Sequence, residues 1–234
     1  MVFDGSDDYI DTGNTFQSTF RDSFSFSAWI YLDDGDDSSS RHLMGSRETG
    51  SEDWIMIRFV SGVIQFYYAS NNNGKYAKTN SAVFSNGATG WHHVVGVANN
   101  STNQLSIYLN GSQQTLGSGA DDGDISSITM ADFTTTRNLF IGARNNIGSA
   151  SEFFDGMIND VAIWDSALTA NEVTALYNSG LPLLPTTDSG NYASADDLVG
   201  YWRNDGVTTW LDRSTNSNNG TVSGSPASII VPEG

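Results

Sequence analysis

"FSFSAWIYL", residues 24–32, is the stretch that decides the fold class of this chain. Every second residue of it belongs to one apolar set: Phe24, Phe26, Ala28 and Ile30. The positions between them hold Ser25, Ser27, Trp29 and Tyr31. Because successive side chains of a β-strand point to opposite faces, this alternation predicts a strand with one face in a core.

The same period of two recurs between turn signals along the chain, and helical periodicity is nearly absent. Further strands are predicted within 53–69, which contains two strands joined at Ser61-Gly62, and within 90–99, 104–114, 138–144 and 154–165. Asn110-Gly111 is a strong hairpin signal because both residues tolerate positive φ. So many short strands predict an all-β sandwich of two antiparallel sheets.

One short helix is predicted in "ALTANEVTALYNSG", residues 167–180. Thr169 stands three residues before Glu172, which is the spacing of a capping box, and Gly180 supplies a stop. The helix spans about two turns and is expected to serve packing.

The C-terminal part contains a connector and then a core-like segment. Residues 181–197, "LPLLPTTDSGNYASADD", hold two of the four prolines and show no periodicity, which is typical of a connector over the surface. Residues 198–222, "LVGYWRNDGVTTWLDRSTNSNNGTV", carry Trp202 and Trp210 on strand-like runs. Chain ends usually fray unless they dock, so this segment is expected to dock.

Composition narrows the classes of partner. The chain has 27 acidic and 10 basic residues, a formal charge of -17, which disfavours nucleic acid and anionic membranes as partners. An acidic surface of this kind serves solubility, and clustered carboxylates also bind hard cations.

A single domain over residues 1–234 is expected, since β-sandwiches often reach this length. The absence of cysteine excludes disulfides, thiol catalysis and zinc-thiolate sites. No run approaches the roughly 20 apolar residues of a membrane span, and "MVFDGSDDYI" at the start lacks the pattern of a cleaved signal.

Six motifs in series resemble the laminin-G-like and pentraxin-like group of concanavalin A-like jelly rolls. They are "FDGSDDYIDTG", "FSFSAWIYL", "GWHHVVGVAN", "LSIYLNG", "LFIGAR" and "FDGMINDVAIWDSALTANEVTALYNSG", and they span residues 3–180. The resemblance implies two packed antiparallel sheets whose edge loops carry calcium and glycan sites.

The order of the motifs departs from that family. Its members open with a strand like "LVGYW" and a loop like "DRSTNSNNGT", which here come after the helix. The chain therefore resembles a circularly permuted member in which residues 198–232 supply the opening strands, an arrangement that adjacent termini permit. We expect Tyr201 and Trp202 to pair near "FDGSDDYI", with Asp212 turning the loop back. A partial resemblance to proteins of marine bacteriophages implies a virion origin.

Calcium is the expected cofactor, at two places. The resemblance implies a first site from Glu52 and Asp53 together with Asn145 and Asn146, although Arg144 there would weaken a metal. It implies a second site on strands that carry Asp4, Asp8, Asp160 and Asp165, whose carboxylates could instead satisfy loop amides. "DDGDD" (33–37) and "DDGD" (121–124) lack the glutamate of an EF-hand and are expected to be solvated turns.

Aromatic and amide side chains in "FYYASNNNGKYAKTN" (66–80) predict a glycan site, because sugars stack on aromatic rings and amides bind their hydroxyls. The alternative is an Asn-rich hairpin with one tyrosine in the sheet. The candidate carbohydrate-binding residues are Tyr67, Tyr68, Tyr76, Asn72, Asn73 and Arg144.

Catalysis is not expected. Related hydrolases carry a tight Glu-x-Asp-x-x-Glu strand, which is absent here, and the chain has only five glutamates: Glu48, Glu52, Glu152, Glu172 and Glu233. His92 and His93 lie in a strand pattern and are interpreted as packing residues, since no nucleophile elbow accompanies them.

The sequence predicts a non-catalytic surface protein of a virion, of the capsid-decoration or fibre type, that binds carbohydrate. Its partners would be glycans or capsid and tail proteins, with a homo-oligomer as a further expectation. Two alternatives stay open: a purely structural subunit-contact protein without glycan binding, and the extracellular carbohydrate-binding module of a secreted bacterial protein.

Overall fold

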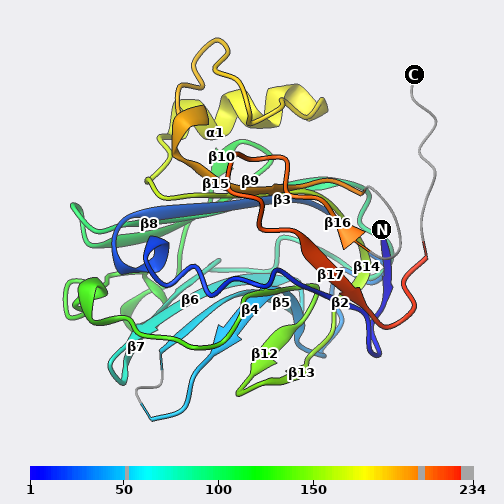
Figure 1. Ribbon diagram of the computed structural model, residues 1–234, viewed down its shortest axis with the longest axis horizontal. Coiled ribbons are helices and arrows are strands. Elements are labelled where there is room, and N and C mark those ends of the chain that lie inside the picture. The colour runs from blue at the N-terminus through cyan, green and yellow to red at the C-terminus, as the bar shows by residue number, and fades with distance from the viewer. Residues whose placement is uncertain (51–52, 205–208, 228–234) are drawn as a thin grey trace.

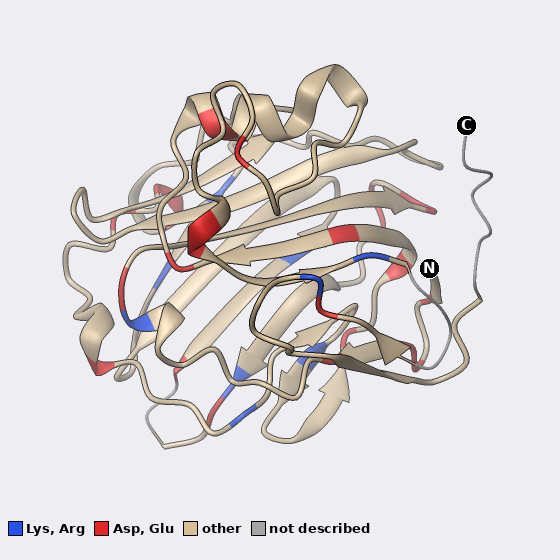
Figure 2. Ribbon diagram, turned by 45° about the horizontal axis from the view of Figure 1, so that its top comes forward, with Lys and Arg blue, Asp and Glu red and all other residues tan. Residues whose placement is uncertain are grey.

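The computed structural model describes residues 1–50, 53–204 and 209–227. Two β-sheets lie face to face, and a helix covers the outer surface of one of them (Figure 1). The predicted all-β sandwich with one short helix is confirmed. Acidic residues are scattered over loops and strand ends of both layers (Figure 2).

The upper sheet in Figure 1, called sheet A, has seven strands within the described residues: β1 (Val2–Asp4), β3 (Phe24–Leu32), β8 (His92–Asn99), β9 (Gln104–Leu109), β10 (Ser112–Gln113), β14 (Asp155–Trp164) and β15 (Leu198–Trp202). Their order is β1-β14-β3-β8-β9-β10. β15 also pairs with β14, at residues 161–164, whereas β1 pairs with residues 155–157.

The lower sheet, called sheet B, has ten strands within the same residues: β2 (Tyr9–Asp11), β4 (Arg41–Arg47), β5 (Trp54–Val60), β6 (Val63–Ser70), β7 (Asn73–Lys78), β11 (Phe140–Ile141), β12 (Arg144–Asn146), β13 (Ser149–Ser151), β16 (Thr209–Trp210) and β17 (Gly220–Ser223). The main path runs β16-β17-β2-β11-β4-β5-β6-β7. β12 adds to β4 as a short parallel strand and pairs with β13.

The main core lies between the sheets. The apolar set of "FSFSAWIYL" faces it, as predicted, and meets Ile55, Ile57 and Phe59 from β5. Ser25, Ser27 and Trp29 on the other face are buried as well. Alternation alone would have left that face in solvent, so something must cover it.

Helix α1 (Ala170–Tyr177) is one part of the cover. The predicted capping box is present: Thr169 Oγ1 accepts from the Glu172 amide at 3.3 Å, and Glu172 Oε2 accepts from the Thr169 amide at 2.8 Å. The left-handed stop falls on Asn178, earlier than the predicted Gly180. No helix among the described residues is long and apolar enough to cross a membrane.

The connector 181–197 is the other part of the cover. Its Tyr192 is buried in a second hydrophobic cluster that fills the space between the cover and sheet A. Tyr192 Oη accepts from Trp164 Nε1 at 2.9 Å and donates to the Pro185 carbonyl at 2.7 Å. The connector is therefore packed onto the domain more tightly than a surface linker.

The C-terminal segment docks in both sheets, as expected. Trp202 and Trp210 are fully buried in the main core. Trp202 pairs with Val161 of β14 rather than with the N-terminal strands, and it is β17 that pairs with β2. Asp212 holds the returning loop as predicted, because its carboxylate accepts from the amides of Tyr201 (2.9 Å), Ser214 (2.9 Å) and Asn218 (2.7 Å). Circular permutation of a family member stays a prediction.

Candidate carbohydrate-binding face

The outer surface of sheet B carries the strongest candidate site. In β5, Ile55, Ile57 and Phe59 face the core, so Trp54, Met56 and Arg58 face outward. Register continues this surface into the neighbouring strands: Arg47 pairs with Trp54, and Met56 with Tyr67, which pairs in turn with Tyr76. We call Arg47, Trp54, Arg58, Tyr67, Tyr76 and Arg144 the arginine–aromatic patch.

The aromatic rings of the patch form a contiguous row. The ring centroids of Trp54 and Tyr67 lie 5.0 Å apart at an interplanar angle of 71°, and those of Tyr67 and Tyr76 lie 4.4 Å apart. A Cβ atom at Gly74 would collide with the Tyr67 hydroxyl, so this glycine lets the Tyr67 ring lie over the adjacent strand. All three rings remain partly exposed.

Two arginines hold the Trp54 ring. The guanidinium carbon of Arg47 is 4.9 Å from the ring centroid, and that of Arg144 is 5.2 Å from it, both within the range of cation–π attraction. Arg144 comes from β12 and lies close over Gly45, where a Cβ would be 3.3 Å from Arg144 Cα. Because Gly45 has no side chain, Arg144 from a distant part of the chain can lie against β4.

Arg58 is oriented by polar neighbours at the other side of the patch. Its Nε donates to Gln65 Oε1 at 2.9 Å, and its Nη1 donates to Ser40 Oγ at 3.2 Å. Both acceptors are uncharged, so neither neutralises the guanidinium.

The buried His42 and the partly exposed Glu152 lie next to Arg144. Glu152 Oε2 lies 3.2 Å from Arg144 Nη1 and 3.2 Å from His42 Nδ1. His42 is fully buried, and burial, followed by the charges of Arg144 and Arg58, holds its pKa well below the usual value. His42 is therefore neutral, and Glu152 has Arg144 as its charged partner.

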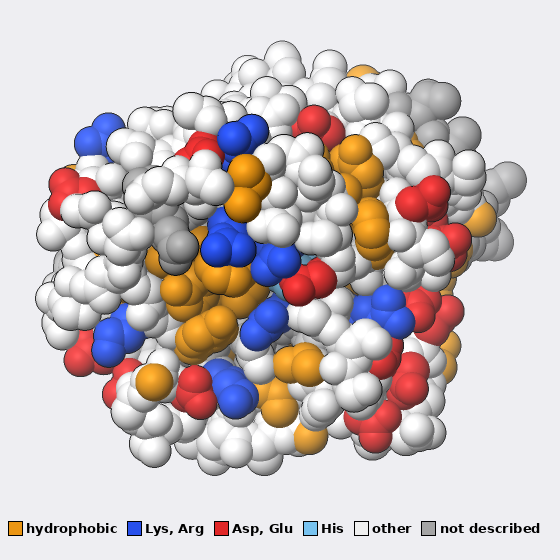
Figure 3. Space-filling view, turned by 90° about the horizontal axis from the view of Figure 1, so that it is seen from below, with side chains coloured by type: hydrophobic (Ala, Val, Ile, Leu, Met, Phe, Trp, Pro, Cys, Tyr) orange, Lys and Arg blue, Asp and Glu red, His pale blue; other side chains and the backbone are white. Residues whose placement is uncertain are grey.

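Positive charge is concentrated here. Figure 3 views this side of the molecule and shows Lys and Arg side chains gathered beside an exposed hydrophobic area. Burial is the main cause that lowers the pKa of Arg144, Glu152 opposes this shift, and Arg47 and Arg58 add to it. The guanidinium groups of Arg47 and Arg58 and the carboxylate of Glu152 thus all act on Arg144, in a chain of formal charge -17.

The predicted sugar-binding residues divide into three groups. Tyr67, Tyr76 and Arg144 lie together in the patch. Tyr68 was predicted wrongly, because strand alternation turns it into the core, where its hydroxyl donates to the Phe20 carbonyl at 2.6 Å.

Asn72 and Asn73 occupy the tight β6–β7 connection and not the patch centre. Asn72 adopts a left-handed conformation with φ of 64°. The side-chain Nδ2 of Asn73 donates to the Ser127 carbonyl. These asparagines shape the turn.

Trp54, Arg47 and Arg58 are patch residues that the sequence interpretation missed. The alternation in "WIMIRF" (54–59) places Trp54 and Arg58 on one face, so that signal was present. Arg47 could not be added without the β4–β5 register, which the sequence does not specify.

At the first predicted calcium place, loop groups already bind the side chains of Asp53 and Asn145. The Asp53 carboxylate already accepts from the Asn71 amide (2.8 Å), the Thr134 amide (2.9 Å) and Thr134 Oγ1 (2.9 Å). The Asn145 side chain donates through Nδ2 to the Asn138 carbonyl and accepts through Oδ1 from the Gly148 amide.

The two remaining members leave calcium binding at that place a prediction. Asn146 Oδ1 is buried without a hydrogen-bond partner in the described part of the chain, and Glu52 lies outside the described residues. Asp53 and Asn145 are therefore loop-holding groups.

The second predicted calcium place is not assembled. Asp4 pairs with Asp155 at one end of β14, whereas Asp165 follows the other end. Asp160 lies between them and binds Tyr201 Oη at 2.6 Å and Arg203 Nε at 3.0 Å. The prediction that strands bring these carboxylates together was wrong, because β14 is long and separates them.

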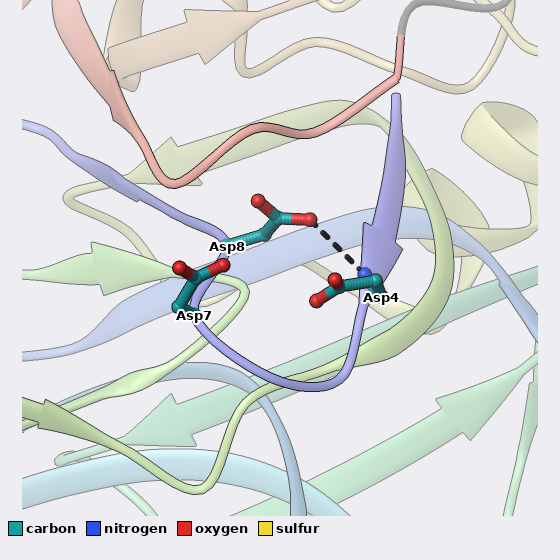
Figure 4. Close-up of side chains that lie close together, drawn as sticks. All are labelled: Asp4, Asp7 and Asp8. Atoms are coloured by element: carbon teal, nitrogen blue, oxygen red, sulfur yellow. Dashed lines mark hydrogen bonds between the residues drawn. The ribbon is translucent and has the colours of Figure 1, made fainter.

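Asp4 and Asp8 do approach one another, with Asp7 as a third member (Figure 4). Single carboxylate oxygens of the three residues lie within 4.8 Å of one another. Asp8 accepts from the amides of Asp4 (3.1 Å) and Ser225 (2.7 Å), and burial is the main cause that raises its pKa. Calcium binding at this turn stays a prediction.

Solved structures with the same fold include carbohydrate-binding proteins. A Bacteroides ovatus protein provisionally assigned to carbohydrate binding is 20% identical, with a TM-score of 0.59 over 99% of this chain and 60% of that one. The chain thus spans 60% of that protein's length. The CBM40 domain of a Ruminococcus gnavus sialidase, bound to α2,6 sialyllactose, is 13% identical, with a TM-score of 0.56 over 76% of this chain and 97% of that one.

A pentraxin of Limulus polyphemus is 16% identical, with a TM-score of 0.50 over 75% of this chain and 80% of that one. No curated protein sequence matches this chain. The sequence profile of the concanavalin A-like lectin/glucanases superfamily matches residues 4–174, well over half of the 234 residues. The chain therefore belongs to the concanavalin A-like lectin/glucanases superfamily.

Proposed function

We propose that this protein binds carbohydrate, without transforming it, through the arginine–aromatic patch. The observation that carries the proposal is the partly exposed row of Trp54, Tyr67 and Tyr76, flanked by guanidinium groups on the outer surface of sheet B. Sugars present apolar CH faces that stack on such rings and hydroxyls that accept from N–H donors.

Unpartnered donors strengthen this interpretation. Trp54 Nε1 and Arg144 Nε are buried and have no hydrogen-bond partner within the described residues. A buried donor without an acceptor costs about 1–3 kcal/mol. A bound ligand that brings acceptors to these atoms would recover that free energy.

The similar proteins support the same function. Two of those reported above are assigned to carbohydrate binding or hold a sialylated sugar on the same fold. At identities of 20% or less they support the fold, and the patch of this chain supports the binding.

Two of the described glutamates, Glu48 and Glu172, are held in structural contacts, which favours binding without catalysis. Glu48 accepts from Thr136 and Arg137, and Glu172 caps α1 and accepts from Ser194. Although burial opposes it, these donors lower the pKa of Glu48 to about 2. A carboxyl of so low a pKa is a poor general acid at neutral pH.

Glycan binding by Trp54→Ala and Tyr76→Ala variants tests the proposal. Trp91→Ala is the matched control, because Trp91 is a tryptophan 43% exposed outside the patch. On a glycan array and by calorimetry, the patch variants should lose binding, while the control retains it. Equal binding by all three variants, or an array with no bound glycan, would refute the proposal.

From the partial sequence resemblance alone, we also propose that the protein acts on a virion surface as a capsid-decoration or fibre component. The patch would then face host glycans, and capsid or tail proteins or further copies of the chain would be its assembly partners. Proteomics of purified virions tests this setting, and a protein found only in secreted bacterial fractions would favour the extracellular alternative.

A further inference from the structure

We infer that the arginine–aromatic patch selects acidic saccharides, and that the sugar carboxylate binds beside Arg144 in competition with the Glu152 side chain. This inference rests on the proposed function, because it names the class of sugar for the same site. It goes further, because neutral and acidic sugars would both satisfy an aromatic row.

Charge is the first argument. Arg47, Arg58 and Arg144 each act electrostatically on this face, and Glu152 is the carboxylate that acts on Arg144. The rest of the chain is acidic, with a formal charge of -17 in total. An acidic saccharide would be repelled over most of the surface and attracted at this one face.

Glu152 is the second argument, because it shows where a carboxylate fits. Its Oε2 lies 3.2 Å from Arg144 Nη1 and 3.2 Å from the neutral His42. The side chain of Glu152 is 32% exposed although its Oε2 is buried, so a ligand carboxylate would reach this guanidinium by displacing the Glu152 carboxylate. Glu152 also has φ of 56°, an uncommon conformation for a residue other than glycine.

Donor geometry is the third argument. Arg144 Nη1 forms an ion pair with Glu152 Oε2 at 3.2 Å, while Arg144 Nε is buried and has no hydrogen-bond partner in the described part of the chain. Trp54 Nε1 is also buried without a hydrogen-bond partner among the described residues. The Arg144 guanidinium carbon lies 5.2 Å from the centroid of the Trp54 ring. A planar carboxylate matches a guanidinium fork in two parallel hydrogen bonds, which a sugar hydroxyl cannot do.

Paired ligands that differ in charge test the inference by calorimetry. The acidic members are sialyllactose and an oligogalacturonide, and their neutral counterparts are lactose and the methyl-esterified oligogalacturonide. At least one acidic member should bind about 10-fold or more tightly than its counterpart, as expected for one charge-assisted pair. That preference should shrink as the salt concentration rises.

Variants locate the charge effect. Arg144→Gln should abolish the preference for the acidic member, and Glu152→Gln should increase it, because a competing carboxylate is removed. Arg203→Gln is the matched control: Arg203 pairs with Asp160 at 3.0 Å on sheet A, and its loss changes the net charge equally. Thermal melting of each variant checks that the fold is intact.

The outcomes separate the two proposals. If neutral and acidic partners bind equally in a Trp54-dependent manner, the inference is wrong and carbohydrate binding stands. If Arg203→Gln weakens acidic binding as much as Arg144→Gln, general charge and not the patch is responsible, and the inference is again wrong. If Glu152→Gln weakens acidic binding, the competition with Glu152 is contradicted. If no saccharide binds, both proposals fail.

Discussion

The outer faces of the two sheets contain similar residues, but the face of sheet A is covered by other segments and the face of sheet B is partly exposed. On sheet A, α1 and the connector cover Trp164, which is fully buried and hydrogen-bonded to Tyr192. On sheet B, Trp54 is partly exposed, and two guanidinium groups lie over its ring. Both faces are rich in aromatic and polar side chains, and only the cover distinguishes them.

Both faces also contain buried polar atoms. Under the cover, Tyr192 Oη accepts from Trp164 Nε1 and donates to the Pro185 carbonyl. Tyr201 Oη donates to Asp160 Oδ1 at 2.6 Å. On sheet B, Trp54 Nε1 and Arg144 Nε lack such partners among the described residues. The covered face also keeps a buried atom that is unpartnered in the described part of the chain, His93 Nδ1, so the partial exposure of the aromatic rings on sheet B, and not the presence of unpartnered polar atoms, distinguishes the two faces.

Truncation after Pro185 should have the largest effect. It removes β15, β16 and β17 together with Trp202 and Trp210, each fully buried in the main core. The loss of one such tryptophan costs about 3–5 kcal/mol, and whole domains are stable by only about 5–15 kcal/mol. Circular dichroism should show no cooperative melting, and a soluble 1–185 fragment with a sharp transition would contradict this account.

Alanine substitutions of Trp164 and Trp54 test whether the outer faces of the two sheets differ in this way. Trp164→Ala should cost about 3–5 kcal/mol in the free energy of unfolding, because it leaves a cavity under the cover. Trp54→Ala should cost less than about 1 kcal/mol and should abolish glycan binding. Urea denaturation and calorimetry measure both quantities. A Trp54→Ala protein as unstable as Trp164→Ala would show that sheet B is not an open face.

Acidic pH should lower the free energy of unfolding through His93, which lies on the covered face of sheet A. Burial lowers the pKa of His93 to about 3, against 6.5 for the ordinary side chain. Between these values the unfolded chain binds the extra proton, so stability is complete above pH 6.5 and falls as the pH drops toward 3.

The slope contributed by one such histidine is at most about 1.4 kcal/mol per pH unit. His93→Phe retains a ring beside Trp29, with which His93 stacks at 5.3 Å, and should flatten this part of the curve. His42 under the patch shifts in the same direction, so part of the slope should persist. Denaturation at pH 4 and pH 7 that shows equal losses for the variant and the wild type would count against His93.

Calcium should have the smallest effect. The Asp4, Asp7 and Asp8 turn lies apart from both outer faces, and two of its carboxylates already accept backbone amides. Millimolar calcium should raise the melting temperature by a few degrees at most, and Asp7→Asn should remove the rise. A melting temperature that is the same in calcium and in chelator would refute the predicted cofactor.

Local patterns predicted the elements well. The alternation in residues 24–32 coincides with β3, and the Thr169–Glu172 spacing gave the observed capping box. These features depend on neighbours in sequence. The cover of sheet A and the place of Trp202 depend on packing between distant segments, which alternation does not report.

The candidate site was predicted only in part, for the same reason. Tyr67, Tyr76 and Arg144 were expected, but the patch also needs the register that pairs Arg47 with Trp54. In the predicted calcium sites, a carboxylate that could bind calcium accepts from loop amides, as in Asp53. Residue type alone does not distinguish these two uses.

The indole N–H signals of the six tryptophans, followed by nitrogen-15 NMR, test the central claim most directly. Each signal can be assigned by substitution, and the titrant is the saccharide that binds most tightly in the paired panel. The account predicts that the Trp54 signal shifts on titration, while the signals of Trp164, Trp202 and Trp210 do not. A saccharide that binds and moves the Trp91 signal, with Trp54 unchanged, would contradict it.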